Sequence, residues 1–405
     1  MHAPRPVVVA PHGVRLAELA LAVGGLAIGT GEFASMGLLP YVASTDHVSI
    51  PTMGHMISAY ALGVVVGAPV ITVLMAKAPR RVMLIVLMSL FALGNLLSAV
   101  APGYDMTVAA RFIAGVPHGA FFGLASLVAA SLVPPDKRAQ AVGRVMLGLS
   151  VANVIGVPLA TGLGQTVGWR WAFVLVGALG ALTAIMVRLF IPVIPVAEGA
   201  GARRELSAFG RPQVWLTLAV GSIGFGGMFA VYSYITPTLI HVTGLPAAAT
   251  PLMLSVIGLG MIAGAVVGGA LADKALTATI FGILIMSAVV QAAFVPAAHN
   301  VWTVTLDLFL VGGGLALAPA LQTRLMDVAG EAQTLAAALN NSAFNIANAM
   351  GAWLGGLSIA AGLGWASTGA VGCGLALGGV VLMVVTVAVE RGSARRRVGA
   401  AAQGV

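Results

Sequence analysis

The sequence predicts an all-α membrane protein with twelve transmembrane helices, arranged as two six-helix bundles related by pseudo-twofold symmetry. Of its 405 residues, 59% are hydrophobic and only 8% are charged, whereas a soluble domain carries about 25% charged residues. Apolar runs of about 20 residues, the length that crosses a bilayer as a helix, recur along the chain. Six runs precede one long polar interruption and six follow it.

The apolar runs follow one another at short intervals. Those of the first half span 16–42, 53–76, 82–101, 106–132, 139–163 and 170–191, and those of the second span 214–239, 249–272, 276–295, 301–325, 332–356 and 367–389. The interruption is bounded by prolines and contains adjacent charges, which favours a linker. We therefore expect an N-terminal bundle at 1–191, a cytoplasmic linker at 192–212, a C-terminal bundle at 213–389 and a basic cytoplasmic tail at 390–405.

The basic residues indicate the orientation of the chain. All 20 lysines and arginines except Arg111 and Arg170 fall on one side of the predicted map. The positive-inside rule makes that side the cytoplasm, so both termini are expected there. The net charge of +8 is therefore interpreted as a topology signal and not as a nucleic-acid-binding signal. The single cysteine, Cys373, excludes an intramolecular disulfide.

The two halves share short sequence patterns. The stretch 63–67 (GVVVG) in the second run matches 264–268 (GAVVG) in the eighth, 201 positions later. The stretch 153–156 (NVIG) in the fifth run matches 348–351 (NAMG) in the eleventh, 195 positions later. These similar offsets indicate a duplicated six-helix unit, and parallel repeats of this kind place a substrate site between the halves near the membrane midplane.

Glu32 is the first candidate for a chemical role. It lies about two helical turns from the end of the first run, where a carboxylate costs at least about 2.5 to 3.5 kcal/mol and tends to be functional. One interpretation is a carboxyl that exchanges a proton for substrate. The other is a permanently protonated or arginine-paired carboxyl that only fixes helix geometry.

Arg111 and His118 lie on one stripe of the fourth run, about 10 Å apart along the helix axis. They are predicted to take part in proton coupling with Glu32. The alternatives are an arginine that extends to the outer interface and a neutral histidine hydrogen-bonded within the packing.

Polar and aromatic residues inside the runs suggest a substrate cavity. Asn341, Asn345 and Asn348 share one face of the eleventh run, which is costly toward lipid. Interhelical bonding is the alternative for the amides, and simple packing is the alternative for the aromatic residues. The predicted lining residues are Phe33, Met36, Tyr60, Phe121, Phe122, Asn153, Tyr232, Tyr234, Gln322, Asn341 and Asn345.

Sequence motifs of enzymes are absent from the chain: it has no P-loop, no HExxH, no GxSxG and no GxGxxG. We therefore expect no enzymatic activity, no metal site and no cofactor apart from the proton as coupling ion.

The sequence resembles the major facilitator superfamily, in particular its drug:proton antiporter branch and the sugar-efflux and chloramphenicol-exporter group within it. The resemblance covers nearly the whole chain. The motifs that carry it are GTGEF with GLLP at 29–40, PHGAFFG at 117–123, GVPL with GWR at 156–170 and ALNNSAFN at 338–345.

The resemblance implies roles for further residues. Arg111 corresponds to the arginine associated with proton coupling, and Gly148, Gly156 and Pro158 to a motif that shapes the tight interface between halves. A cytoplasmic gating loop is matched in the second half by Asp273 and Lys274. In the first half Lys77, Arg80 and Arg81 are retained, but Ala76 and Pro79 replace the expected Asp and Gly.

The expected function is proton-coupled efflux of small organic molecules, such as a phenicol antibiotic, across the bacterial cytoplasmic (inner) membrane by alternating access. The alternative is a sugar efflux permease or an uncoupled facilitator of the same fold. A membrane sensor without transport is a third possibility, which would call for additional soluble domains. The expected partners are a small-molecule substrate and the lipid bilayer, with no nucleic acid, and the chain is expected to be a monomer.

Overall fold

The helices follow the apolar runs in a computed structural model, which describes residues 11–74, 78–134, 137–193, 210–329 and 333–403. The first half contains α1 (Pro11–Thr45), α2 (Ile50–Met53), α3 (His55–Leu74), α4 (Arg80–Val100), α5 (Tyr104–Gly115), α6 (His118–Ser131), α7 (Arg138–Val151), the π-helix η2 (Ala152–Gly156), α8 (Val157–Thr166) and α9 (Trp169–Phe190). The second contains α11 (Pro212–Gly224), α12 (Gly226–Ser233), α13 (Ile235–His241), η4 (Ala247–Ala249), α14 (Thr250–Ala297), α15 (Val301–Gly313), η5 (Gly314–Ala316), α16 (Leu317–Ala329), α17 (Gln333–Ala360) and α18 (Ser367–Gln403).

Ten stretches of the described chain are long and apolar enough to cross a membrane. One of them includes all of α14, whose 48 residues contain a non-helical break at Ala275. This single stretch therefore covers two predicted runs. The last helix extends beyond its predicted run of 367–389, because α18 continues to Gln403. The segment after Val389 has no proline and is rich in alanine and arginine, which favour helix.

Prolines lie at two of the interruptions within the predicted runs. Pro117 separates α5 from α6, and Pro158 follows the π-helix η2. Proline has no backbone N–H, so the carbonyl four residues earlier loses its helical donor. For Pro158 that carbonyl belongs to Val154, and it accepts a hydrogen bond from the Ser255 hydroxyl of α14 at 3.1 Å. A helix defect in the first half is thus satisfied by the second half.

Close helix crossings repeat in the two halves, but not in the expected register. A Cβ at Gly63 would clash with the carbonyl of Phe112, and a Cβ at Gly260 would clash with that of Phe309. Two more pairs behave in the same way. Gly67 packs on Val116 in the first half as Gly264 packs on Gly313 in the second. Likewise, Gly115 packs on Tyr60 as Gly312 packs on Ile257. Each second-half residue follows its counterpart by 197 positions (260 against 63, 309 against 112).

The predicted offset of 201 is therefore wrong by four residues, about one helical turn. Glycine recurs every fourth residue at 260, 264 and 268 in α14, so the glycines still align after a slip of one turn, and the valines between them favoured the wrong register. The second predicted match is wrong too. Gly351 packs on the backbone of Gly226 and Ala230 as Gly148 packs on that of Ala22 and Leu26, so its counterpart is Gly148 rather than Gly156.

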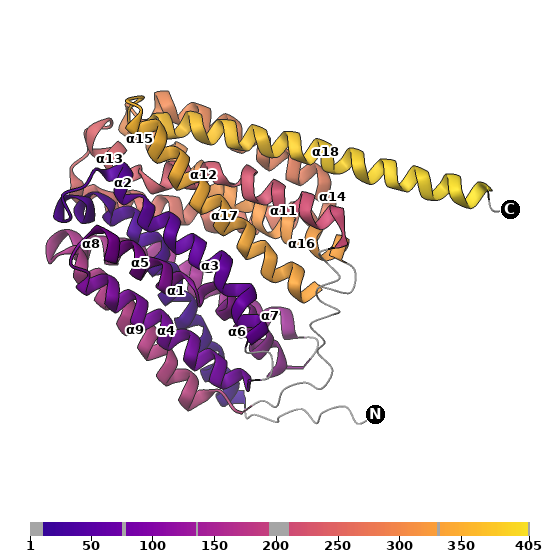
Figure 1. Cartoon of the computed structure of the whole chain (residues 1–405), viewed down its shortest axis with the longest axis horizontal. Coiled ribbons are helices and arrows are strands. Elements are labelled where there is room, and N and C mark those ends of the chain that lie inside the picture. The colour runs from indigo at the N-terminus through magenta and orange to yellow at the C-terminus, as the bar shows by residue number, and fades with distance from the viewer. Residues whose placement is uncertain (1–10, 75–77, 135–136, 194–209, 330–332, 404–405) are drawn as a thin grey trace.

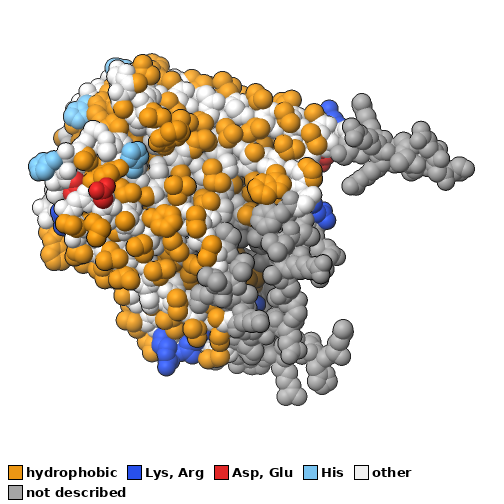
Figure 2. Space-filling model, viewed as in Figure 1, with side chains coloured by type: hydrophobic (Ala, Val, Ile, Leu, Met, Phe, Trp, Pro, Cys, Tyr) orange, Lys and Arg blue, Asp and Glu red, His pale blue; other side chains and the backbone are white. Residues whose placement is uncertain are grey.

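The bundle has two chemically different ends. We use "basic end" for the one that carries Arg80, Lys137 and Arg211, and "opposite end" for the one that carries α2 and α13, which lie together in Figure 1. In Figure 2 hydrophobic side chains cover most of the visible surface, while acidic and histidine side chains gather mainly near the opposite end. This distribution suits a protein embedded in a bilayer.

Hydrogen bonds hold the halves together from the middle of the bundle to the opposite end. Thr236 donates to the carbonyl of Gly37 at 3.1 Å, and Ser58 donates to that of Ala349 at 3.0 Å. Near the opposite end, the Gln165 amide donates to the carbonyl of Ala247 at 3.0 Å.

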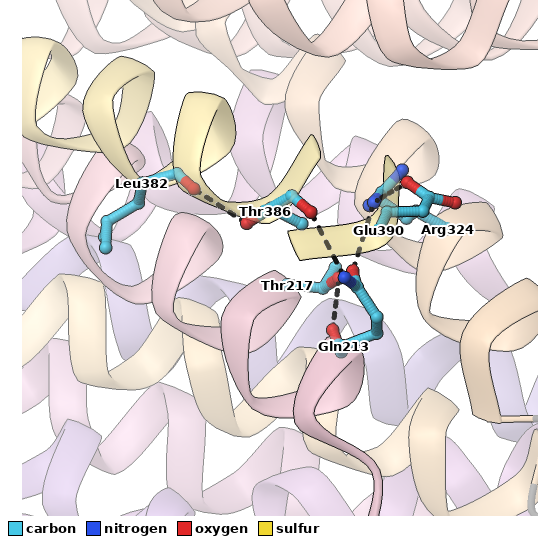
Figure 3. Close-up of polar contacts among 6 residues, drawn as sticks. All are labelled: Gln213, Thr217, Arg324, Leu382, Thr386 and Glu390. Carbon is cyan, nitrogen blue, oxygen red and sulfur yellow. Dashed lines mark hydrogen bonds and ion pairs between the residues drawn. The ribbon is translucent and has the colours of Figure 1, made fainter. Parts of the chain in front are cut away.

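At the basic end, ion pairs join helices of the same half. Figure 3 shows the buried Arg324 of α16, which contacts Glu390 of α18 at 2.9 Å and Gln213 of α11 at 3.3 Å. In the first half, Arg144 of α7 contacts Glu18 of α1 at 2.8 Å. Each half is therefore tied internally at the basic end.

Candidate functional site

Glu32 of α1 lies at the contact between the two halves. Its side chain is buried, with 7% of the residue exposed. Its Oε1 accepts a hydrogen bond from Nδ2 of Asn348, a fully buried residue of α17, at 3.0 Å. This bond joins residues 316 positions apart and connects the expected proton site to the second half.

Arg111 of α5 is fully buried and does not extend to an interface. Its guanidinium donates to the carbonyl of Gly31 at 3.0 Å and to Oδ1 of Asn95 at 3.2 Å. The guanidinium also lies over the ring of Tyr60, 4.3 Å from the ring centre. Among the described residues no ion pair joins Arg111 to Glu32, so the arginine-paired interpretation of Glu32 is not what the structure contains.

His118 is connected to Arg111 through Tyr60. The Tyr60 hydroxyl and Nδ1 of His118 are 3.1 Å apart. The His118 ring packs edge-on against the Phe122 ring, with the ring centres 5.3 Å apart. Arg111, Tyr60 and His118 thus form a buried chain behind Glu32, held by α3, α5 and α6. Among the described residues His118 makes no hydrogen bond to Glu32, with which it was predicted to act in proton coupling, and it reaches Arg111 through Tyr60.

The predicted aromatic lining divides into two groups. Phe33 of α1 stacks on Tyr232 and Phe229 of α12, with ring centres 5.4 and 6.3 Å apart. This stack lies next to Glu32 in sequence and crosses between the halves. Met36 and Tyr234 belong to the same apolar cluster. Tyr60, Phe121 and Phe122 belong to a separate cluster inside the first half.

The predicted amides differ in their contacts. Asn153 and Asn345 each donate to a carbonyl of their own helix, that of Leu149 at 3.0 Å and that of Asn341 at 2.9 Å. Gln322 accepts from Asn340 at 2.8 Å, which fits the interhelical interpretation for that residue.

Several buried polar atoms near the interface have no partner among the described residues. They are Oδ1 of Asn153, Oδ1 of Asn345, Oδ1 of Asn348 and the hydroxyl of Tyr232. An unsatisfied buried group costs about 1 to 3 kcal/mol. Each of these oxygens has the capacity to accept a hydrogen bond from a hydroxyl or amide group.

The residues of the implied interface motif pack differently from the expectation. A Cβ at Gly148 would clash with the backbone of Ala22, and one at Gly156 with the Thr30 hydroxyl. Both glycines therefore pack on α1 of their own half, and not on the second half. This segment contacts the second half instead through Asn153, whose backbone packs against Gly258 of α14, and through the Val154 carbonyl, which accepts from Ser255.

The expected gating residues lie at the basic end. Arg81 of α4 donates to the carbonyl of Arg188 of α9, and Arg80 begins α4. Asp273 and Lys274 are exposed beside the break at Ala275. Lys77 lies outside the described residues. Among the described residues, Asp273 makes no hydrogen bond or ion pair with another helix end, so the expected gate contact is not formed in this arrangement.

Sequence reasoning did not identify the partners that hold the charged groups. Asn95 and Ser35 bind Arg111. Both are isolated polar residues in apolar runs, and that isolation is the only feature of the sequence that points to a buried polar partner. Asn348 belongs to the recognised amide stripe, but its bond to Glu32 depends on how α1 packs against α17. Asp307 of α15, 5% exposed and with Oδ2 unpartnered among the described residues, was also missed.

Comparisons with known proteins give the chain its relatives. Residues 21–312 match the sequence model of the Major Facilitator Superfamily. The inner membrane transport protein YdhP of Escherichia coli (strain K12) is 44% identical over 89% of this chain and 93% of its own. A probable sugar efflux transporter of Helicobacter pylori (strain HPAG1) is 29% identical over 82% and 85%. The crystal structure of a bacterial homolog of the lysosomal transporter Spinster has a TM-score of 0.71 at 18% identity, covering 94% and 96%.

Proposed function

This chain belongs to the major facilitator superfamily, and we propose that it exports small organic molecules by proton-coupled alternating access, with Glu32 as the proton-binding group. It is a multi-pass protein of the bacterial inner membrane, and its relatives are transporters rather than enzymes. The observation that carries the proposal is the hydrogen bond between Glu32 and Asn348, which connects a buried carboxyl to the opposite half.

Protonation of Glu32 changes this bond in a defined way. A hydrogen bond to an ionised carboxylate is roughly twice as strong as one between neutral groups. The ionised form therefore favours the arrangement in which the halves meet at Glu32 and at the opposite end. A proton on Glu32 weakens this bond, and a substrate bound between the halves replaces it, so the substrate-loaded protein opens there with Glu32 ionised. Arg111 and His118 tune the site through Tyr60.

The proton supplies enough free energy for export. One elementary charge moving down 100 mV yields about 2.3 kcal/mol, and about 1.4 kcal/mol changes an equilibrium ten-fold. One proton per cycle thus sustains a substrate gradient of a few tens-fold.

The topology is part of the proposal. The basic end faces the cytoplasm by the positive-inside rule, so both termini are cytoplasmic and the arrangement with its halves joined at the opposite end is closed to the outside. The chain crosses the membrane twelve times as a monomer, with α14 contributing two crossings and α17 one. The parts are 1–191, the linker 192–212, 213–389 and the tail 390–405.

Two substrate classes have support. The stack of Phe33 on Phe229 and Tyr232 offers flat surfaces for an aromatic solute such as a phenicol antibiotic. The unpartnered oxygens of Asn153 and Asn345 suit a hydroxyl-rich solute. A sugar efflux permease or an uncoupled facilitator is therefore the second candidate, and one relative is described as a probable sugar efflux transporter.

Efflux measurements distinguish these candidates. Cells that express the protein are tested against phenicols, other antibiotics and pentoses for resistance and for efflux of labelled compound. Everted vesicles then receive the compound that is exported, with and without a protonophore. We expect accumulation against a gradient that the protonophore abolishes. Equilibration that is unaffected by the protonophore would instead identify an uncoupled facilitator.

A further inference from the structure

A groove on the surface of the first half has no part in the export mechanism. It lies between α1 and α7 near the basic end and has a volume of about 570 Å³. Its wall is formed mainly by Leu19, Val23, Leu26, Leu147 and Val151. Leu19, Leu147 and Val151 are 52%, 58% and 42% exposed. Exposed apolar side chains within membrane spans are suited to contact with acyl chains.

The groove opens on the outside of the bundle. Asn153, whose backbone packs against Gly258 of the second half, follows Val151 by two residues. Two residues along a helix are about 200° apart, so Val151 faces away from the second half. Gly148, also in the groove, packs on α1. The groove therefore faces the bilayer and not the space between the halves.

The rim of the groove at the basic end is positively charged. Arg15 is exposed there, and the side chain of Arg144 is 44% exposed. Glu18, whose side chain is 4% exposed, neutralises Arg144 through one oxygen at 2.8 Å. The two arginines and one carboxylate leave a net charge of one positive unit. A guanidinium has five N–H donors, and the described contacts of Arg144 use only Nη1.

We propose that this groove binds one anionic phospholipid, with its phosphodiester at Arg15 and Arg144 and an acyl chain against the leucines of the wall. A net charge of minus one on the headgroup, as in phosphatidylglycerol, complements the rim. Basic pockets between transmembrane helices on the cytoplasmic side recognise anionic headgroups by this combination of charge and apolar depth.

Native mass spectrometry of the full chain in neutral detergent, titrated with phosphatidylglycerol, tests the proposal. The parent protein is expected to retain one phosphatidylglycerol at saturation, and to bind phosphatidylcholine or free glycerol phosphate more weakly. Arg15→Gln should weaken phosphatidylglycerol binding about five-fold, whereas Arg15→Lys should preserve it. Leu147→Trp, which fills the groove, should also weaken it.

The matched control is Arg391→Gln, which removes one exposed positive charge from α18, outside the groove. Because Arg15 and Arg391 are both exposed, both variants should elute and unfold as the parent does. An equal loss of phosphatidylglycerol in both would mean diffuse surface attraction and would overturn the proposal. Equal binding of phosphatidylcholine, or of free glycerol phosphate, would also overturn it.

Discussion

Asn348→Ala removes the only described donor to the side-chain carboxyl of Glu32 while leaving that carboxyl in place. Hydrogen bonds to charged groups contribute about 1.5 to 3 kcal/mol. If the ionised carboxyl holds the halves together through this bond, the equilibrium between the present arrangement and one open at the opposite end shifts about ten-fold to a hundred-fold toward opening. Asn345→Ala is the matched control, because the Asn345 amide donates within its own helix.

Crosslinking at the opposite end measures this shift. Gln165 donates to the carbonyl of Ala247 across the halves, so cysteines at these two positions report closure when Cys373 is replaced by serine. In the Asn348→Ala background, a short bismaleimide should crosslink the pair much less than in the parent, while Asn345→Ala leaves crosslinking unchanged. Unchanged crosslinking in Asn348→Ala would refute the reasoning that this bond favours closure.

Two further predictions concern the scaffold. Gly63→Ala and Gly260→Ala should each lower the free energy of unfolding by about 1 to 3 kcal/mol, because the added methyl meets backbone. Gly143→Ala is the control and should leave the free energy of unfolding unchanged, because a Cβ there meets open space. Thermal unfolding in detergent compares the three variants. A Gly260→Ala variant as stable as the parent would argue against the equivalence of the halves. Ser255→Ala should cost about 1 kcal/mol by leaving a carbonyl freed by proline unpaired. In a double-mutant cycle Pro158→Ala, which restores a backbone N–H, should reduce that cost; strictly additive effects would contradict this assignment.

Most of the fold is predictable from the hydrophobic pattern of the sequence. Apolar runs predict helices wherever lipid or core surrounds them, and the described helices lie close to the predicted ranges. The errors in the register between the two halves arose where the same residue type recurs at helical spacing. Glycine at every fourth position of α14 allowed a slip of one turn, and only the pairing of Gly63 with Phe112 and of Gly260 with Phe309 fixes the register.

The candidate site was predicted in its charged members but not in their partners. The cost of placing Glu32 and Arg111 in apolar runs marks both residues without any knowledge of packing. The partners that form hydrogen bonds with these two side chains depend on how helices distant in sequence pack together. Arg111 binds the Gly31 carbonyl and Asn95 in its own half, which leaves Asn348 to bind Glu32.

Proton release on substrate binding tests the central role of Glu32 most directly. The purified protein, in weakly buffered detergent solution with a pH indicator, receives the substrate identified by the efflux panel. The parent protein and Asp105→Asn, which removes an exposed carboxylate, should release about one proton per bound substrate at a pH where Glu32 is protonated beforehand. Glu32→Gln should bind substrate without release. Undiminished proton release from Glu32→Gln would contradict the account.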